Sequence, residues 1–175
     1  MRIERIEEFL LEADQRAKIS ALLLTCFPGF PIDRIYFKQP PGFRYLVWEG
    51  DELIAHMGVE YRLVGHAGEM IPIFGIMDLC VLPAHQHQRL ASKLLVELGE
   101  LGKKNAIDFL LLVAKNKALY ENNGFFAGSN TCQWLMLVDN RVLGMVKRKL
   151  PELMVKPLGK KAWPEGLIDF MGSLF

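Results

Sequence analysis

The sequence predicts one α+β domain, with a mixed, mostly antiparallel twisted sheet flanked by helices and one βαβ crossover. Strand-like segments rich in aromatic and β-branched residues follow one another across short turns between Phe43 and Val81. A leucine-rich helical pattern comes next, and a nearly all-apolar run typical of a buried strand follows at Ile107–Ala114. With 175 residues, 51% of them hydrophobic, and no linker-like tract, we expect a single domain over residues 1–175.

Charge and the length of the apolar runs argue against several classes of function. Lys and Arg total 21 against 20 for Asp and Glu, so the net charge of +1 creates no field that would attract nucleic acid or anionic lipid. Apolar runs such as Ile71–Met77 are far shorter than the roughly 20 residues that span a bilayer. The N-terminal segment Met1–Glu8 is too charged for a secretory signal. We therefore expect a cytoplasmic protein that binds neither nucleic acid nor membrane.

The cysteines and histidines do not suggest a metal site. The chain has three cysteines with no CxxC spacing: Cys26, Cys80 and Cys132. This odd number favours buried thiols in a reducing compartment over a disulfide framework. His85 and His87 flank one another in a loop, but no further ligand follows at a spacing typical of zinc. His56 has apolar neighbours and is predicted to be a core histidine with satisfied hydrogen bonds.

The first part of the chain predicts two helices. In Ile6–Cys26, apolar residues recur at spacings of three and four, which indicates an amphipathic helix that ends near Pro28 and Gly29. The aromatic segment Phe27–Phe37 contains two prolines, which favour turns around a short second helix.

Three strands of an antiparallel meander are predicted next. Tyr45–Trp48 and Leu53–Val64 form a hairpin across the turn Glu49–Glu52. A second turn at Gly65–Gly68 leads to the third strand, Met70–Val81.

The crossover occupies the middle of the chain. Leucines at helical spacing predict a helix from about Gln88 to Gly102, and Ile107–Ala114 is the strand that follows it. A short helix around Lys117–Asn123 ends at Gly124, a residue favoured after helix ends. Another strand is predicted over Phe125–Val138.

The C-terminal part allows two interpretations at first. Arg141–Val155 fits either a pair of strands or a helix broken at Pro151. The tail from Gly159 carries Trp163 and Phe170, so we expect it to dock on the domain rather than expose an apolar patch. The apolar tail also gives a weak indication of a homodimer.

A strand that ends near Val81 is followed by a polar loop and a helix that opens near Gln88. The first amides of a helix have no partner within it, and together with the helix dipole they attract anions such as phosphate.

Two motifs resemble those of the GNAT superfamily of N-acetyltransferases. The segment Val81–Leu95 resembles the acyl-CoA signature Gln/Arg-x-x-Gly-x-Gly/Ala, which Gln86 and Ala91 match. Downstream, Ala118–Phe125 resembles the helix-borne Tyr followed by Gly-Phe of that family. The order of elements is similar over most of the chain. The pattern is closest to the branch of aminoglycoside 2'-N-acetyltransferases and nodulation N-acyltransferases.

One position departs from the signature. Arg89 stands where most of the family has Gly, which lets the backbone approach a diphosphate. The Arg89 side chain must therefore point to solvent or itself pair with a phosphate.

The resemblance implies that acetyl-CoA is the co-substrate and that its acetyl group passes to a primary amine of a small molecule by direct attack. It also implies that the pantetheine arm pairs with a strand edge and that loop amides hold the diphosphate. The residues implied to bind acetyl-CoA are Leu79, Cys80, Val81, Gln86, His87, Gln88, Arg89, Leu90, Ala91, Ser92 and Asn116.

The same resemblance implies the catalytic groups. Tyr120 protonates the leaving thiolate, and a backbone N–H near Leu79 or Cys80 stabilises the oxyanion. Asp78 and Glu60 are the candidates for the base that deprotonates the incoming ammonium. Asp78 fits a solvent-facing strand residue equally well, and for Glu60 the pattern favours the solvent-facing residue.

Asp33, Tyr36 and Asp169 are the candidate acceptor-binding residues. Phe27–Phe37 is mainly apolar, which favours a less charged or partly hydrophobic amine over a polycationic sugar. Two alternatives stay open: a non-catalytic acyl-CoA-binding sensor or scaffold, and an acyltransferase that uses a longer acyl chain.

Overall fold

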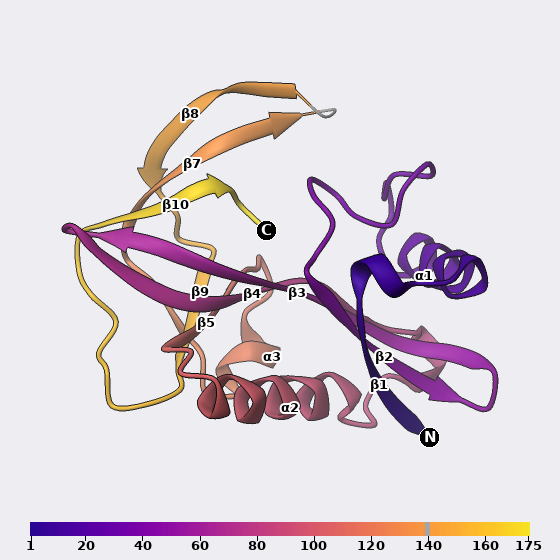
Figure 1. The fold of residues 1–175 in the computed structure, drawn as a ribbon. Coiled ribbons are helices and arrows are strands. Elements are labelled where there is room, and N and C mark those ends of the chain that lie inside the picture. The colour runs from indigo at the N-terminus through magenta and orange to yellow at the C-terminus, as the bar shows by residue number, and fades with distance from the viewer. Residues whose placement is uncertain (139–140) are drawn as a thin grey trace. The chain divides into compact units, whose positions relative to one another are not determined.

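The computed structural model describes residues 1–138 and 141–175, which fold into two compact units (Figure 1). The first unit holds Met1–Glu60 and Ile76–Val96, and the second holds Tyr61–Gly75 and Glu97–Phe175. Three elements contribute residues to both units, namely β3 (Glu52–His66), β4 (Glu69–Val81) and α2 (Leu90–Lys104). The predicted mixed, mostly antiparallel α+β class is confirmed.

The first unit is built on antiparallel strands. Besides its parts of β3, β4 and α2, it contains β1 (Arg2–Glu7), a 3-10 turn (Glu8–Leu10), α1 (Ala13–Cys26), β2 (Phe43–Glu49) and a second 3-10 turn (Pro83–His85). The pairs Ile3↔Val47 and Leu46↔His56 define the registers of β1 with β2 and of β2 with β3. An apolar cluster that includes Leu23 packs inside this unit.

The predicted helix over Ile6–Cys26 is wrong in its first turns. Arg2–Glu7 has only two apolar residues, Ile3 and Ile6, and it forms the strand β1 by pairing along its whole length with β2. The helix begins only at Ala13, where Glu12 and Gln15 form a capping box and the Glu12 N–H donates to Gln15 Oε1 at 3.0 Å.

The short second helix predicted within Phe27–Phe37 is also absent from this fully described stretch, which runs as turns and bends. Pro28 and Pro31 remove two backbone donors that a helix would need. The buried Phe30 ring instead packs edge-on against Phe37, with ring centroids 4.9 Å apart.

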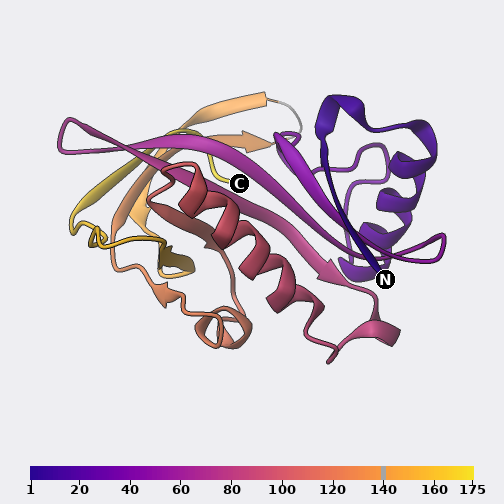
Figure 2. The same cartoon turned by 60° about the horizontal axis from the view of Figure 1, so that its bottom comes forward.

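The second unit contains the crossover. Its further elements are β5 (Phe109–Val113), α3 (Ala118–Glu121), β6 (Phe126–Ala127), β7 (Thr131–Val138), β8 (Arg141–Lys149), β9 (Leu153–Pro157) and β10 (Leu167–Ser173). In this unit β4 pairs in parallel with β5, with Ile73 opposite Phe109, after the chain has passed through α2 (Figure 2). The predicted strand–helix–strand crossover is therefore confirmed.

The single strand predicted over Phe125–Val138 is split into β6 and β7. Between them lies Asn130, which is buried and needs polar partners. Its Nδ2 donates to the carbonyls of Pro164 and Gly166 at 2.9 and 3.1 Å, and its Oδ1 accepts from Trp163 Nε1 at 2.6 Å. The following segment forms two strands rather than a broken helix, but β8 pairs with β7 and β9 pairs with β5 and β6.

The predicted docking of the tail is confirmed. Ile168 and Phe170 on β10 are fully buried in the core of the second unit. The terminal Phe175 ring packs edge-on against Phe170 at 5.5 Å and lies over Gly75, where a Cβ would come within 2.2 Å of the ring. Within the described part of the chain, no helix has the length and apolar character needed to cross a bilayer.

Candidate functional site

In the first unit, strand β4 is irregular at Asp78. Its φ of 52° lies in the left-handed region, which strand residues do not normally occupy but which Asp tolerates better than most. The Asp78 carbonyl is bonded to His56 Nδ1 at 2.8 Å. A side chain from β3 thus holds the backbone of β4 at this point.

The contact between His56 and Asp78 is part of a buried polar network. The Arg44 side chain is fully buried and donates to Glu8 Oε2 at 2.5 Å, to the Ile35 carbonyl at 2.8 Å and to His56 Nε2 at 2.8 Å. Because a guanidinium can only donate, His56 Nε2 must accept, and Nδ1 therefore carries the proton donated to Asp78. Burial and the Arg44 charge lower the pKa of His56 to about 3, so the ring is neutral. His56 is the satisfied core histidine that the sequence predicts.

Strand register explains how the network assembles. Arg44 is opposite Gly58 and His56 is opposite Leu46, so the two side chains are diagonal neighbours on one face of the β2–β3 pair. Sequence reasoning missed Arg44, although a cation inside the apolar run Phe43–Trp48 was a usable signal.

The Asp78 carboxyl is itself perturbed. Burial raises its pKa to about 6, with the nearby positive charge of Arg44 opposing part of that shift. A carboxyl with this pKa is ionised at neutral pH and binds a proton more readily than an ordinary aspartate. These are the properties required of a general base near neutrality.

The raised pKa predicts a pH dependence that Asp78→Asn should remove. The folded protein binds this proton more tightly than the unfolded chain, so it holds more protons between pH 3.8 and about 6. Its unfolding free energy should therefore fall by on the order of 1–3 kcal/mol as pH rises through that window, and level off above it. Urea unfolding at several pH values measures the difference between wild type and variant.

The matched control is Asp51→Asn, in the exposed β2–β3 turn. A wild-type protein whose stability relative to Asp78→Asn does not change with pH would contradict the perturbed carboxyl.

After β4, the loop that leads to α2 has an unusual backbone. Gln86 Nε2 donates to the Val81 carbonyl at 3.4 Å and so ties the loop to the end of the strand. His87 and Arg89 have φ values of 65° and 59°, both left-handed. Arg89 thus adopts the conformation that Gly reaches without strain, and its side chain is exposed.

Helix α2 starts directly after these residues. Its first intrahelical bond runs from the Lys93 N–H to the Arg89 carbonyl at 3.0 Å, which leaves the Leu90 and Ala91 amides without a partner inside the helix. Alternating left-handed residues next to a helix start make a concave set of N–H groups that suits an anion. The loop thus presents main-chain donors of the kind that bind anions.

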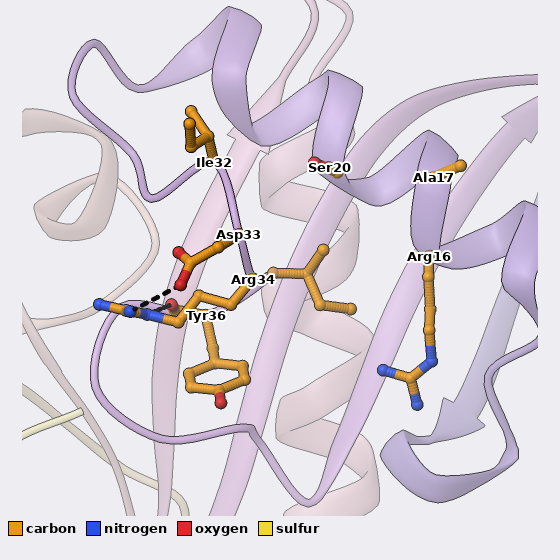
Figure 3. A pocket seen from close by; sticks show the side chains of 8 residues that line it. Arg16, Ala17, Ser20, Ile32, Asp33, Arg34 and Tyr36 are labelled. Carbon is orange, nitrogen blue, oxygen red and sulfur yellow. Dashed lines mark hydrogen bonds and ion pairs between the residues drawn. The ribbon is translucent and has the colours of Figure 1, made fainter. Parts of the chain in front are cut away.

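A cavity of about 410 Å³ lies between α1 and the following loop (Figure 3). It is lined by Arg16, Ala17, Ser20, Ile32, Asp33, Arg34, Ile35 and Tyr36. Asp33 pairs with Arg34 at 3.5 Å, and the Arg34 guanidinium lies 5.9 Å from the centre of the Tyr36 ring. The structure thus brings together two of the predicted acceptor-binding residues, Asp33 and Tyr36, and the charge of Asp33 is largely balanced.

Tyr120 lies in the second unit, on α3. It is half-buried, and its ring packs edge-on against Phe125 with centroids 5.8 Å apart. Burial raises the pKa of the phenol, which is protonated at neutral pH. Asn116 Oδ1 accepts from the Ala118 N–H at 3.3 Å, and Gly124 has a φ of 83° just after the helix, so both ends of this short segment are defined.

Two further predicted site residues, Asp169 and Glu60, each lie in a different environment. Asp169, also in the second unit, accepts from Gln133 Nε2 at 3.0 Å and from the Met171 N–H at 2.8 Å, so both carboxylate oxygens have protein partners. Glu60 is partly buried, at the point where the first-unit part of β3 ends. Across residues 1–138 and 141–175, no group of three or more His, Cys, Asp or Glu side chains is placed to bind a metal.

Comparison with known proteins identifies the fold. Residues 41–126 match the family model described as an acetyltransferase (GNAT) domain. This range includes the irregular strand, the loop, α2 and α3. No curated protein sequence matches the chain significantly.

Solved structures agree with the family model. A GNAT family N-acetyltransferase, YhbS from Escherichia coli in complex with CoA, has a TM-score of 0.66 at 18% identity, covering 97% of this chain and 90% of that one. A GNAT family acetyltransferase from Brucella melitensis in complex with acetyl-CoA has a TM-score of 0.59 at 16% identity, covering 95% and 94%. Eis1 from Mycobacterium abscessus, at 14% identity and a TM-score of 0.57, covers 74% of this chain but the match spans only 32% of its own length. At these identities the likeness establishes the GNAT fold.

Proposed function

We propose that this GNAT-fold chain is an acyl-CoA-dependent N-acetyltransferase that transfers the acetyl group of acetyl-CoA to a primary amine of a small molecule. The observation that carries the proposal is the loop before α2, where His87 and Arg89 are both left-handed and the first helical amides follow. That loop lies inside the segment that matches the acetyltransferase model. Neighbours of the same fold, crystallised with CoA and with acetyl-CoA, support the choice of anion.

The proposed binding roles follow the chain. Amides of Gln86–Ala91 hold the diphosphate, and the backbone of Leu79–Val81 pairs with the pantetheine arm. The left-handed Asp78 makes the strand irregular just before that segment, and the proposed role of the amides that follow is to face the thioester oxygen. The Glu8–Arg44–His56 network keeps this irregular backbone in place through the Asp78 carbonyl.

The proposed chemical roles use two further groups. The thioester supplies an activated acetyl group, which a neutral amine attacks directly. Asp78 takes the proton that the incoming ammonium must lose, since its raised pKa suits a base near neutrality. Tyr120 gives its proton to the departing thiolate, because the burial of its phenol keeps it protonated. Glu60 is the second candidate for the base.

Calorimetric titration with CoA tests the binding site. We expect a dissociation constant in the micromolar range for the wild type, and an affinity at least about tenfold weaker for Arg89→Glu, which places a negative charge beside the diphosphate. Like Arg, Glu has a side chain, so the strain of the left-handed backbone at position 89 should be similar in the wild type and the variant. Lys160→Glu makes the same change of charge at another exposed position and should bind CoA like the wild type.

Absence of heat at millimolar CoA, with the protein folded by circular dichroism, would refute the proposed function. Equal weakening by both charge reversals would show that the effect of Arg89→Glu is general electrostatics rather than a local diphosphate site.

The cavity on the first unit supports a particular class of acceptor. One carboxylate, Asp33, and two guanidinium groups, Arg16 and Arg34, line it together with Ile32 and Ile35. A polycationic aminoglycoside would meet net positive charge there. We therefore propose a primary amine of low charge and partly apolar character, and a screen of such amines against amino sugars and polyamines with a thiol-release readout would test it.

A further inference from the structure

Two of the three cysteines lie side by side in the first unit. Cys26 is the last residue of α1, and its Sγ lies 3.6 Å from the carbonyl of Val81 on β4. The thiol of Cys80, the preceding residue on the strand, is hydrogen-bonded to Cys26. Both side chains pack in the same apolar cluster. A helix end and a strand, far apart in sequence, are thus joined through two neighbouring sulfur atoms.

The two thiols differ in exposure and in the direction in which their pKa values are shifted. Cys26 is partly exposed, whereas Cys80 is 7% exposed. The hydrogen bond from Cys80 lowers the pKa of Cys26, while the same contact and burial raise the pKa of Cys80. Cys26 is therefore the sulfur that ionises first and that solvent reaches, and Cys80 is the protonated partner beside it. A partly exposed thiol with a lowered pKa next to a second thiol is the arrangement typical of redox-sensitive cysteines.

We propose that Cys26 and Cys80 form a redox-modification site that a hydroperoxide converts into a disulfide. The Cys26 thiolate attacks the terminal oxygen of the hydroperoxide, the O–O bond breaks, and the leaving alkoxide or hydroxide takes up a proton. The sulfur of Cys80, losing its proton, then attacks the resulting sulfenic acid, the S–O bond breaks, and water leaves. Two thiols are oxidised by two electrons in total, and one hydroperoxide is reduced to an alcohol, or to water, plus water.

Oxidation would also act on the neighbouring strand. A disulfide bond is about 2.05 Å long, much shorter than a hydrogen bond between two thiols, so its formation draws the end of α1 and β4 together. Cys80 lies within Leu79–Val81, the segment proposed to pair with the pantetheine arm. Resting on the proposed function, the coupling predicts that the oxidised protein binds CoA about tenfold more weakly than the reduced protein.

Peptide mass mapping of the full chain tests the modification directly. Reduced protein is exposed to a small excess of hydrogen peroxide, denatured, alkylated and digested. We expect a linked Cys26–Cys80 peptide that has lost two hydrogens, alkylation confined to Cys132, and recovery of all three thiols with dithiothreitol. Cys132 is an internal control, because it is fully buried in the second unit and burial raises its pKa to about 11.

Single variants check the order of events. In Cys80→Ser, Cys26 should accumulate a sulfenic acid that dimedone traps, and in Cys26→Ser, Cys80 should stay a free thiol. The proposal is overturned if wild-type Cys26 proceeds to sulfinic or sulfonic acid while Cys80 is still alkylated, or if Cys132 oxidises as readily as Cys26. The wild-type map decides these outcomes even if a variant at the buried Cys80 fails to fold.

Calorimetry with CoA on reduced and oxidised protein tests the coupling. If the reduced and oxidised proteins bind CoA with equal affinity, the proposed effect of the disulfide on CoA binding is refuted. Failure of the reduced protein to bind CoA would refute the proposed function, while the mass map would still decide whether the disulfide forms.

Discussion

Replacing Tyr120 by Phe should lower the turnover of acetyl-CoA at least about 100-fold while leaving CoA affinity nearly unchanged. The phenol is the proposed proton donor to the leaving thiolate, and burial keeps it protonated at neutral pH. Phe preserves the ring and therefore its edge-on packing against Phe125 at 5.8 Å. The measurement is thiol release from acetyl-CoA in the presence of acceptor amines, paired with calorimetric CoA binding.

Tyr61→Phe is the matched control, since it removes the same hydroxyl from a tyrosine that is 59% exposed and should leave turnover unchanged. Full activity in Tyr120→Phe would assign the proton donor to another group. A wild-type protein that binds CoA but releases no thiol with any amine would favour the alternative of a non-catalytic acyl-CoA sensor or scaffold.

Replacing Glu8 by Ala should destabilise the protein by about 3 kcal/mol. Glu8 is the carboxylate that faces the fully buried Arg44 guanidinium, at 2.5 Å. Its removal takes away the carboxylate that is hydrogen-bonded to a buried guanidinium, which costs far more than the loss of an exposed pair. The unfolding free energy from urea denaturation measures the effect. Because the network also holds the Asp78 carbonyl through His56, we expect CoA binding to weaken as well.

Glu7→Ala provides the comparison one residue earlier. Glu7 faces Arg5 at 3.9 Å, with side chains 41% and 45% exposed, so its loss should cost less than about 1 kcal/mol. If Glu8→Ala and Glu7→Ala have similar effects, water compensates the Arg44 charge and the network is not the buried constraint described above.

Much of the architecture could be predicted because it is local in origin. The hairpins of β2, β3 and β4, helix α2 and the turn at Gly124 follow from side-chain periodicity and glycine position within a few residues of chain. The wrong predictions concern segments whose structure depends on contacts with residues far away in the sequence. Arg2–Glu7 is a strand because β2 offers an edge to pair with, and Asn130 interrupts a strand because Trp163 and two carbonyls of the tail satisfy its amide.

The features of the candidate site likewise fall into those that are local in sequence and those that depend on tertiary contacts. The GNAT-like order of elements, the loop from Gln86 to Ala91 and the position of Tyr120 could all be predicted before folding was considered, because they depend on residue type and on spacing along the chain. Three features became visible only in the folded chain: the left-handed backbone of Arg89, the support of the Asp78 carbonyl by Arg44 and His56, and the proximity of Cys26 to Cys80. The reason is physical: burial, hydrogen bonding and pKa shifts depend on which groups are brought within a few ångströms of each other, and residues distant in sequence meet only when the chain folds.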